Sequence, residues 1–109
     1  MGVNIMFAFG VEELADEAET ESVANALTDL VREEGFQEHE VGVRWDLADG
    51  RHWVAGQTDY PIGISRFYAW RPRFEAAIQE RVYAVAPSAK AGITFWYPDE
   101  LAAKRESSG

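Results

Sequence analysis

The chain has 109 residues, of which 47% are hydrophobic and 13% aromatic, and this length predicts one domain folded around one core. It has no cysteine, which excludes disulfides, thiolate metal ligands and a cysteine nucleophile. Nineteen acidic side chains against ten basic ones give a net charge of −9, and such a field repels nucleic acids and anionic membrane surfaces while it favours basic partners.

The first two predicted elements are a strand and a helix. Residues 3–11 alternate with apolar members in both sets, which is typical of a central strand covered on both faces. Apolar residues at helical spacing predict an amphipathic helix over 20–34, with Thr20 or Ser22 as the cap of its first turn. An earlier start at Glu12 stays open, although it would make the middle of the helix polar all round.

A tight hairpin is predicted after this helix. Gly35 and Phe36 predict a Schellman stop at the end of the helix, and strict alternation then runs through residues 41–48 and 51–58. Asp49-Gly50 between the two runs suits a two-residue type I′ turn. That turn sets a register in which Val41, Val43, Trp45 and Leu47 pair with Thr58, Gly56, Val54 and His52.

This register gives the hairpin one apolar and one polar face. The apolar face carries Val41, Val43, Trp45, Leu47 and Val54, and the polar face carries Arg44, Asp46, Trp53 and Gln57. Because the side chains of a strand alternate strictly between its two faces, we expect Trp45 in the core and Trp53 at the surface.

The last third of the chain contains a helix and a closing strand. Residues 64–70 fit both a strand and a helical stripe, and Pro72 favours a helix that starts near it, since proline is best placed in a first helical turn. The helix is expected to end before Pro87, and alternation over residues 91–97 predicts a strand. Pro98 begins a short helical turn or a tail.

The predicted order is strand, helix, strand, strand, helix, strand, in a single α+β domain over residues 1–100. Right-handed crossings that share the hairpin give a ferredoxin-like, split βαβ fold, in which a four-stranded antiparallel sheet carries both helices on one face. The other face of such a sheet is open to a partner. Residues 101–109 are expected to form a short helical turn or a disordered tail.

Residue types that carry chemistry are present without a specific motif. His39 and His52 lie too far apart on the predicted hairpin to share a metal ion, and His52 fits either a hydrogen-bonded turn residue or a general base. Ser65 lacks the second glycine of a nucleophile elbow, and no phosphate-binding loop is present. We therefore expect no catalytic residue, no metal and no cofactor.

Two features point instead to a protein partner. Six of the ten residues from Glu12 to Glu21 are acidic, which suits either attraction of a basic protein or solubility alone. The chain also has more large aromatic residues than its core needs, and exposed Trp and Tyr are typical of interface centres. The partner-binding candidates are Glu12, Glu13, Asp16, Glu17, Glu19, Trp53, Tyr68, Trp70 and Trp96, and the one basic cluster, Arg66, Arg71 and Arg73, is available to pair with the acidic stretch.

The C-terminal part resembles a known group of proteins. Residues 86–100, with Ala86-Pro87-Ser88 at their start and Asp99-Glu100 at their end, follow an amphipathic helix and are similar to the end of some small acidic immunity proteins of bacterial polymorphic-toxin systems. The resemblance implies that an acidic surface with embedded aromatic residues occludes the basic active site of a toxin. The acidic residues would then steer association and the aromatic residues would anchor the complex.

The leading hypothesis is a non-enzymatic acidic protein-binding module, an inhibitor or immunity-type protein that occludes a basic partner such as a toxin or nuclease, as a monomer or a homodimer. The first alternative is a dimeric ferredoxin-like enzyme or small-ligand binder, with a pocket lined by Trp45, His52, Tyr60 and Tyr68. The second is a structural or assembly subunit. No export signal and no apolar run of about 18 residues are present, so we expect a cytoplasmic protein.

Overall fold

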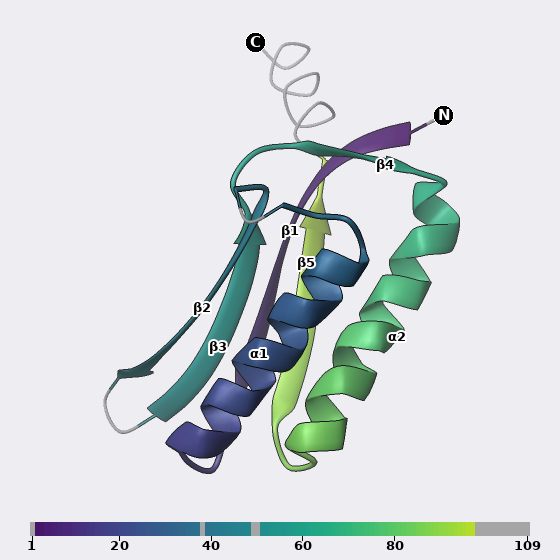
Figure 1. Ribbon diagram of the computed structural model, residues 1–109. Helices are drawn as coiled ribbons and strands as arrows, with labels where there is room; N and C mark the ends of the chain where they lie inside the picture. Colours follow the sequence, from purple (N-terminus) through teal and green to yellow (C-terminus); the bar gives the residue numbers. More distant parts are fainter. Residues whose placement is uncertain (1, 38, 49–50, 98–109) are drawn as a thin grey trace, which may run out of the picture.

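Strand β1 (Gly2–Glu12) is the central strand of the sheet. The computed structural model describes residues 2–37, 39–48 and 51–97, so the predicted turn at Asp49-Gly50 and the predicted tail from Pro98 lie outside the described residues. The other elements are α1 (Glu17–Glu33), β2 (Val41–Ala48), β3 (Arg51–Thr58), β4 (Ile62–Ser65), α2 (Phe67–Val85) and β5 (Lys90–Trp96) (Figure 1).

The sheet is antiparallel and, within the described residues, has five strands. β1 pairs with β3, β4 and β5, and β2 pairs with β3. The α+β class with two helices and an antiparallel sheet is therefore confirmed, whereas the prediction of four strands is wrong. The added strand is β4, in which Ile62 pairs with Ile5 of β1. Ile62 and Ile64 are buried and their neighbours are exposed, so this short alternation forms a strand against the start of β1.

The register of the β2–β3 hairpin is confirmed at each predicted pair. Val41 lies opposite Thr58 and Trp45 lies opposite Val54. The agreement follows from the two-residue spacing between the strands, because a two-residue connection leaves only one in-register pairing. Trp45 is nevertheless 38% exposed, so the prediction that it belongs to the core is wrong.

Helix α1 begins earlier than predicted because Asp16, and not Thr20 or Ser22, is its N-cap. The Glu19 backbone N–H donates to Asp16 Oδ1 at 2.8 Å, and Glu19 Oε1 accepts from the Ala15 backbone N–H at 3.1 Å. The first bond satisfies an amide group that a helix start leaves unpaired, and the second ties the residue before the cap to the first turn. Thr20 is buried in the first turn, where its hydroxyl donates to the Asp16 carbonyl.

The end of α1 is the predicted Schellman stop. Gly35 has φ +90, in the left-handed region that glycine enters without strain. The Phe36 N–H donates to the Val31 carbonyl at 3.1 Å and the Gly35 N–H donates to the Arg32 carbonyl at 3.0 Å, which is the pair of bonds that defines the motif. Phe36 is buried, so the stop also adds an aromatic ring to the core.

Helix α2 begins at Phe67 and contains Pro72 in its interior, so the prediction of a start near Pro72 is wrong. Proline removes one backbone hydrogen bond from a helix interior. The turn before it buries Phe67 and Trp70, and the burial of two large aromatic side chains outweighs the loss of that bond. Arg66 precedes the helix with φ 54 and makes no side-chain cap.

A buried threonine at the end of β3 makes hydrogen bonds to the central strand. Thr58 is 3% exposed; its Oγ1 accepts from the Phe7 N–H at 3.1 Å, and its hydroxyl donates to the Phe7 carbonyl at 3.4 Å. We expect Thr58→Val to lower the free energy of unfolding by about 1–3 kcal/mol, because valine leaves the Phe7 amide unpaired. Thr58→Ser keeps the hydroxyl and should lose less in urea unfolding; equal losses would show that the two hydrogen bonds to Phe7 do not account for the effect.

Candidate functional site

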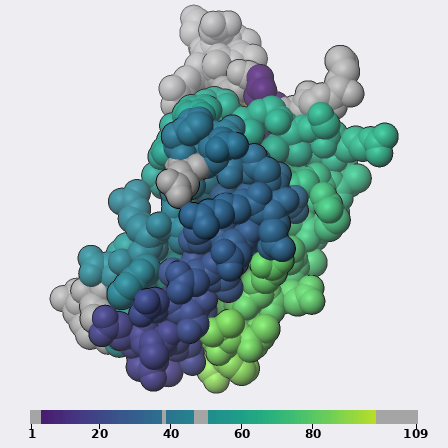
Figure 2. Space-filling model, in the orientation of Figure 1, coloured from purple at the N-terminus to yellow at the C-terminus, as the bar shows by residue number. Residues whose placement is uncertain are grey.

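The acidic candidates gather where β1 ends and α1 begins. We call this group the acidic end: Glu12, Glu13, Asp16, Glu17 and Glu19. All are exposed except Glu19, which is half-buried. The acidic end is at the bottom of Figure 1, where α1 starts, whereas α2 starts at the opposite end of the molecule. Figure 2 shows the start of α1 in purple, at the lower left of the surface.

Three members of the acidic end also have structural contacts. Asp16 and Glu19 cap α1, and negative charge in this first turn is favourable because it faces the positive end of the helix dipole. Glu13 Oε1 lies 3.6 Å from Lys90 Nζ, between two exposed side chains, and has φ 60. Glu12 and Glu17 are therefore the members best suited to a binding test that leaves the fold intact.

Two adjacent hollows lie beside the acidic end on one face of the sheet. We call this the outer face, and its central residues are Ala8, Gly10, Ala55 and Gly92. One hollow, of about 500 Å³, lies between β1 and β5 and includes Glu12 and Lys90 in its lining. The other, of about 230 Å³, lies between β1 and the hairpin and includes Trp53 and Arg44. Both contain Ala8, so they form one open surface that reaches from Trp53 to Glu12.

Small side chains create these hollows. A Cβ added at Gly10 or Gly92 would meet no atom within 4 Å, and Ala8 lies beside Gln57 on one side and Thr94 on the other. The sequence predicts an open sheet face with Trp53 on it. It does not predict the hollows, because their depth depends on which small residues become neighbours across three strands.

The remaining aromatic candidates lie away from the acidic end. Trp96 is half-buried and pairs with Met6, near the start of β1, and Tyr68 is 80% exposed in the first turn of α2. The structure therefore groups Trp53 with the acidic end and separates Tyr68 and Trp96 from it.

The prediction that Trp70 is an exposed partner-binding residue is wrong. Trp70 is 7% exposed, and its ring stacks on Phe74 with centroids 4.6 Å apart. It also lies edge-on to Phe36 at 6.1 Å. Trp70, predicted at the surface, is thus a core residue, whereas Trp45, predicted in the core, is exposed.

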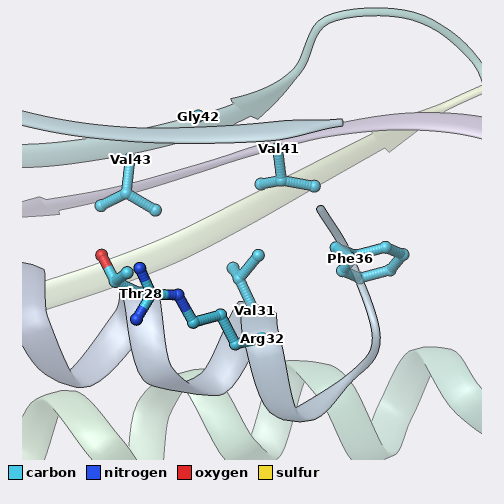
Figure 3. Close-up of a pocket in the computed structure, with 7 residues that line it drawn as sticks. All are labelled: Thr28, Val31, Arg32, Phe36, Val41, Gly42 and Val43. Carbon is cyan, nitrogen blue, oxygen red and sulfur yellow. The ribbon is translucent and has the colours of Figure 1, made fainter. Parts of the chain in front are cut away.

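A third hollow separates α1 from the edge strand β2 (Figure 3). It has a volume of about 270 Å³. Val41 and Val43 point from β2 toward the helix, and Thr28, Val31 and Arg32 reach toward the strand from α1. The lining side chains are mostly apolar, apart from the Thr28 hydroxyl and the Arg32 guanidinium. Such a lining suits the docking of an apolar group more than catalysis. Sequence reasoning missed this hollow, because it depends on how far the helix stands from the strand.

The described residues do not form the pocket of the small-ligand alternative. Trp45, Tyr60 and Tyr68 are each exposed, so they do not line an enclosed space between sheet and helices. Tyr60 stacks on His39 with centroids 6.4 Å apart, and desolvation together with Glu40 and Asp59 raises the pKa of its hydroxyl. Among the described residues, no group of three or more His, Asp or Glu is placed to hold a metal ion.

Two arginines of the basic cluster, Arg71 and Arg73, pair with residues outside the acidic end. Arg71 Nε lies 3.0 Å from Glu75 Oε1, and its guanidinium is 4.6 Å from the centroid of Phe95. The hydrogen bond to Glu75 is the main cause of the raised pKa of Arg71. Arg73 lies 4.0 Å from Glu34. The Phe95 and Glu34 contacts join α2 to its neighbours, and within the described residues neither arginine pairs with the acidic stretch as suggested.

The comparisons with known proteins inform the fold alone. No protein-family profile matches the chain, and no curated relative matches it. The de novo designed protein Foldit4 is similar in structure, with a TM-score of 0.61 and 12% identity over 85% of this chain and 96% of that one. The de novo designed protein LFR1 1, described as having a ferredoxin fold, matches with a TM-score of 0.44 and 16% identity over 85% of this chain and 84% of that one. Neither helix in the described part of the chain combines the length and apolar character of a membrane span.

Proposed function

We propose that this protein is a non-enzymatic binding module of the inhibitor or immunity type, which covers a basic surface on a partner protein such as a toxin or nuclease. The observation that carries the proposal is the junction of the acidic end with Trp53 and the hollowed outer face. The acidic end supplies negative charge, and Trp53 supplies an aromatic side chain beside a hollow of the outer face.

Charge and aromatic contact have different roles in such a complex. Long-range attraction raises the association rate and falls as salt increases. Residues such as tryptophan, seated near the centre of the contact, mainly slow dissociation. Trp53 is half-buried, and a side chain with restricted freedom loses less entropy on binding.

We also infer that the fold follows the ferredoxin-like plan, with β4 as an added strand and both helices on one face. This inference is supported by the contacts of α1 with β2 and β3, of α2 with β5, β1 and β4, and of the two helices with each other. It is also supported by β1, in which Ile5, Phe7, Phe9 and Val11 are buried while Ala8 and Gly10 between them are half-buried. A cytoplasmic location is part of the proposal, and the cysteine-free composition favours it.

The test removes charge from the acidic end without removing its helix cap. The double variant Glu12→Gln, Glu17→Gln keeps Asp16, Glu19 and Glu13 intact. The partner is first captured from source cells on the immobilised wild-type protein and identified by mass spectrometry, and then purified. In stopped-flow measurements at low salt, we expect the double variant to associate about tenfold more slowly, with a smaller change in the dissociation rate.

A matched control removes the same charge elsewhere. Asp29→Asn with Glu80→Gln changes the net charge equally at two exposed helix positions outside the acidic end. The control pair should associate at close to the wild-type rate. Equal slowing by both pairs would show that net charge alone matters, and a partner that is not basic would contradict the proposal directly.

A further inference from the structure

Strand β2 is an edge strand of the sheet. It has eight residues and, among the described elements, its backbone pairs with β3 alone. Edge strands of natural proteins are usually short or interrupted by proline, lysine or a bulge, because their free N–H and C=O groups can pair with another chain. β2 contains no proline and no lysine, and its Trp45 is one of the exposed large hydrophobic residues. These properties favour pairing along this edge.

The sequence of β2 is complementary to itself in one antiparallel register. In a continuous sheet with two-fold symmetry, side chains that lie opposite each other share a face, so the axis passes through one residue and its copy. An axis at Arg44 would place two arginines together, and an axis at Asp46 would place two aspartates together. An axis at Trp45 places Arg44 of each copy opposite Asp46 of the other.

We propose that two copies of this chain pair through antiparallel β2 edges, centred on Trp45. Each copy then contributes one Arg44 and one Asp46 to two cross-strand ion pairs on one face, while the two Trp45 side chains meet on the other face. Arg44 and Asp46 are both exposed, and Trp45 shares its face with the buried Val54 across the hairpin. The inference does not depend on the proposed function, since no residue of the acidic end takes part.

The charge distribution permits this contact despite the acidity of the protein. The net charge of the chain is −9, but residues 41–58 contain Arg44 and Arg51 against Asp46 and Asp49, so the hairpin as a whole is neutral. At physiological ionic strength, charges farther away than about 8 Å are largely screened. Two hairpins therefore meet without the repulsion that two acidic ends would produce.

The contact is narrow, which sets the expected strength. Edge pairing of one strand covers less than the roughly 800 Å² per partner of a standard stable interface. We expect a dimer that forms in the micromolar range or above, and not a permanent one. Sedimentation equilibrium of the full chain, from about 5 to about 500 µM at physiological salt, should therefore show a rising average mass.

Charge swapping tests the register. Arg44→Asp alone places two aspartates opposite each other at both pairs, and Asp46→Arg alone does the same with two arginines, so each should raise the dimer dissociation constant about tenfold or more. The double variant Arg44→Asp, Asp46→Arg restores opposite charges and should return within about threefold of wild type. A monomer at all concentrations, or a dimer that neither single variant weakens, or a double variant that does not recover, overturns the proposal.

A cross-link test gives a second readout, because the chain has no native cysteine. In either class of antiparallel pair, opposed Cα atoms lie about 4.5–5.5 Å apart, within disulfide range. Trp45→Cys should therefore form a reducible dimer under mild oxidation, and adding Arg44→Asp should suppress it. Tyr68→Cys, at a position that is 80% exposed, is the control. Equal cross-linking of the two cysteine variants would overturn the proposal.

Discussion

Phe7→Ala is expected to lower the free energy of unfolding by about 3–5 kcal/mol, a large part of the stability of a domain of this size. Phe7 is fully buried at the centre of the sheet. Its ring lies 5.3 Å from that of Phe74 and 5.9 Å from that of Phe95, measured between centroids. It also contacts the rings of Phe9, Phe36 and Trp70. Alanine would leave a cavity that this set of rigid rings cannot close.

The measurement is urea unfolding followed by tryptophan fluorescence and circular dichroism together. Phe7→Leu is the matched variant, and it should lose less because leucine retains most of the volume. Tyr68→Ala removes an exposed aromatic residue and should change stability by no more than about 0.5 kcal/mol. A loss below about 1 kcal/mol for Phe7→Ala would mean that the aromatic core repacks and is not closely packed.

Gly56→Ala is the second large expected effect, with a loss of about 1–3 kcal/mol. Phe9 lies directly opposite Gly56 in the sheet, and a Cβ at position 56 would lie 2.1 Å from Phe9 Cζ. Because Phe9 is itself buried, its ring has little room to move away. The one methyl group therefore forces either the ring or the strand to shift.

Gly92→Ala is the control, since a Cβ there meets no atom within 4 Å. It should be neutral or stabilising by up to about 1 kcal/mol, because alanine restricts the unfolded chain. Combining Gly56→Ala with Phe9→Leu should recover part of the loss, since the smaller side chain makes room for the methyl group. Strictly additive losses in the double variant would show that the steric conflict is not the cause.

The features that the sequence predicts correctly are controlled by short-range chemistry. The hairpin register depends on the two residues between its strands, and the end of α1 depends on the conformational freedom of Gly35. The early start of α1 at Asp16 was open to the same kind of reasoning. The capping pair Asp16 and Glu19 has the spacing of a capping box, but the regular apolar stripe of the helix begins only at Val23.

The features that the sequence does not predict depend on packing between distant parts of the chain. Pro72 predicts a helix start only if the preceding residues gain little from being helical, and Phe67 and Trp70 gain burial in the core. Trp45 is on the apolar face of its strand and is still exposed, because β2 is at the edge of the sheet. The acidic end was predictable because its residues lie close together in the sequence. Its proximity to Trp53 and to the hollows could not be predicted, because it depends on how the strands pair.

The pairing of β1 with β5 has a consequence for the life of the polypeptide before it is complete. On one side, residues 6–12 of β1 pair with residues 90–96, so this side of the central strand stays bare until β5 has left the ribosome. Long sequence separation of this kind slows folding, and a bare apolar strand is prone to aggregation. During synthesis, this domain should therefore depend on chaperones more than its small size suggests.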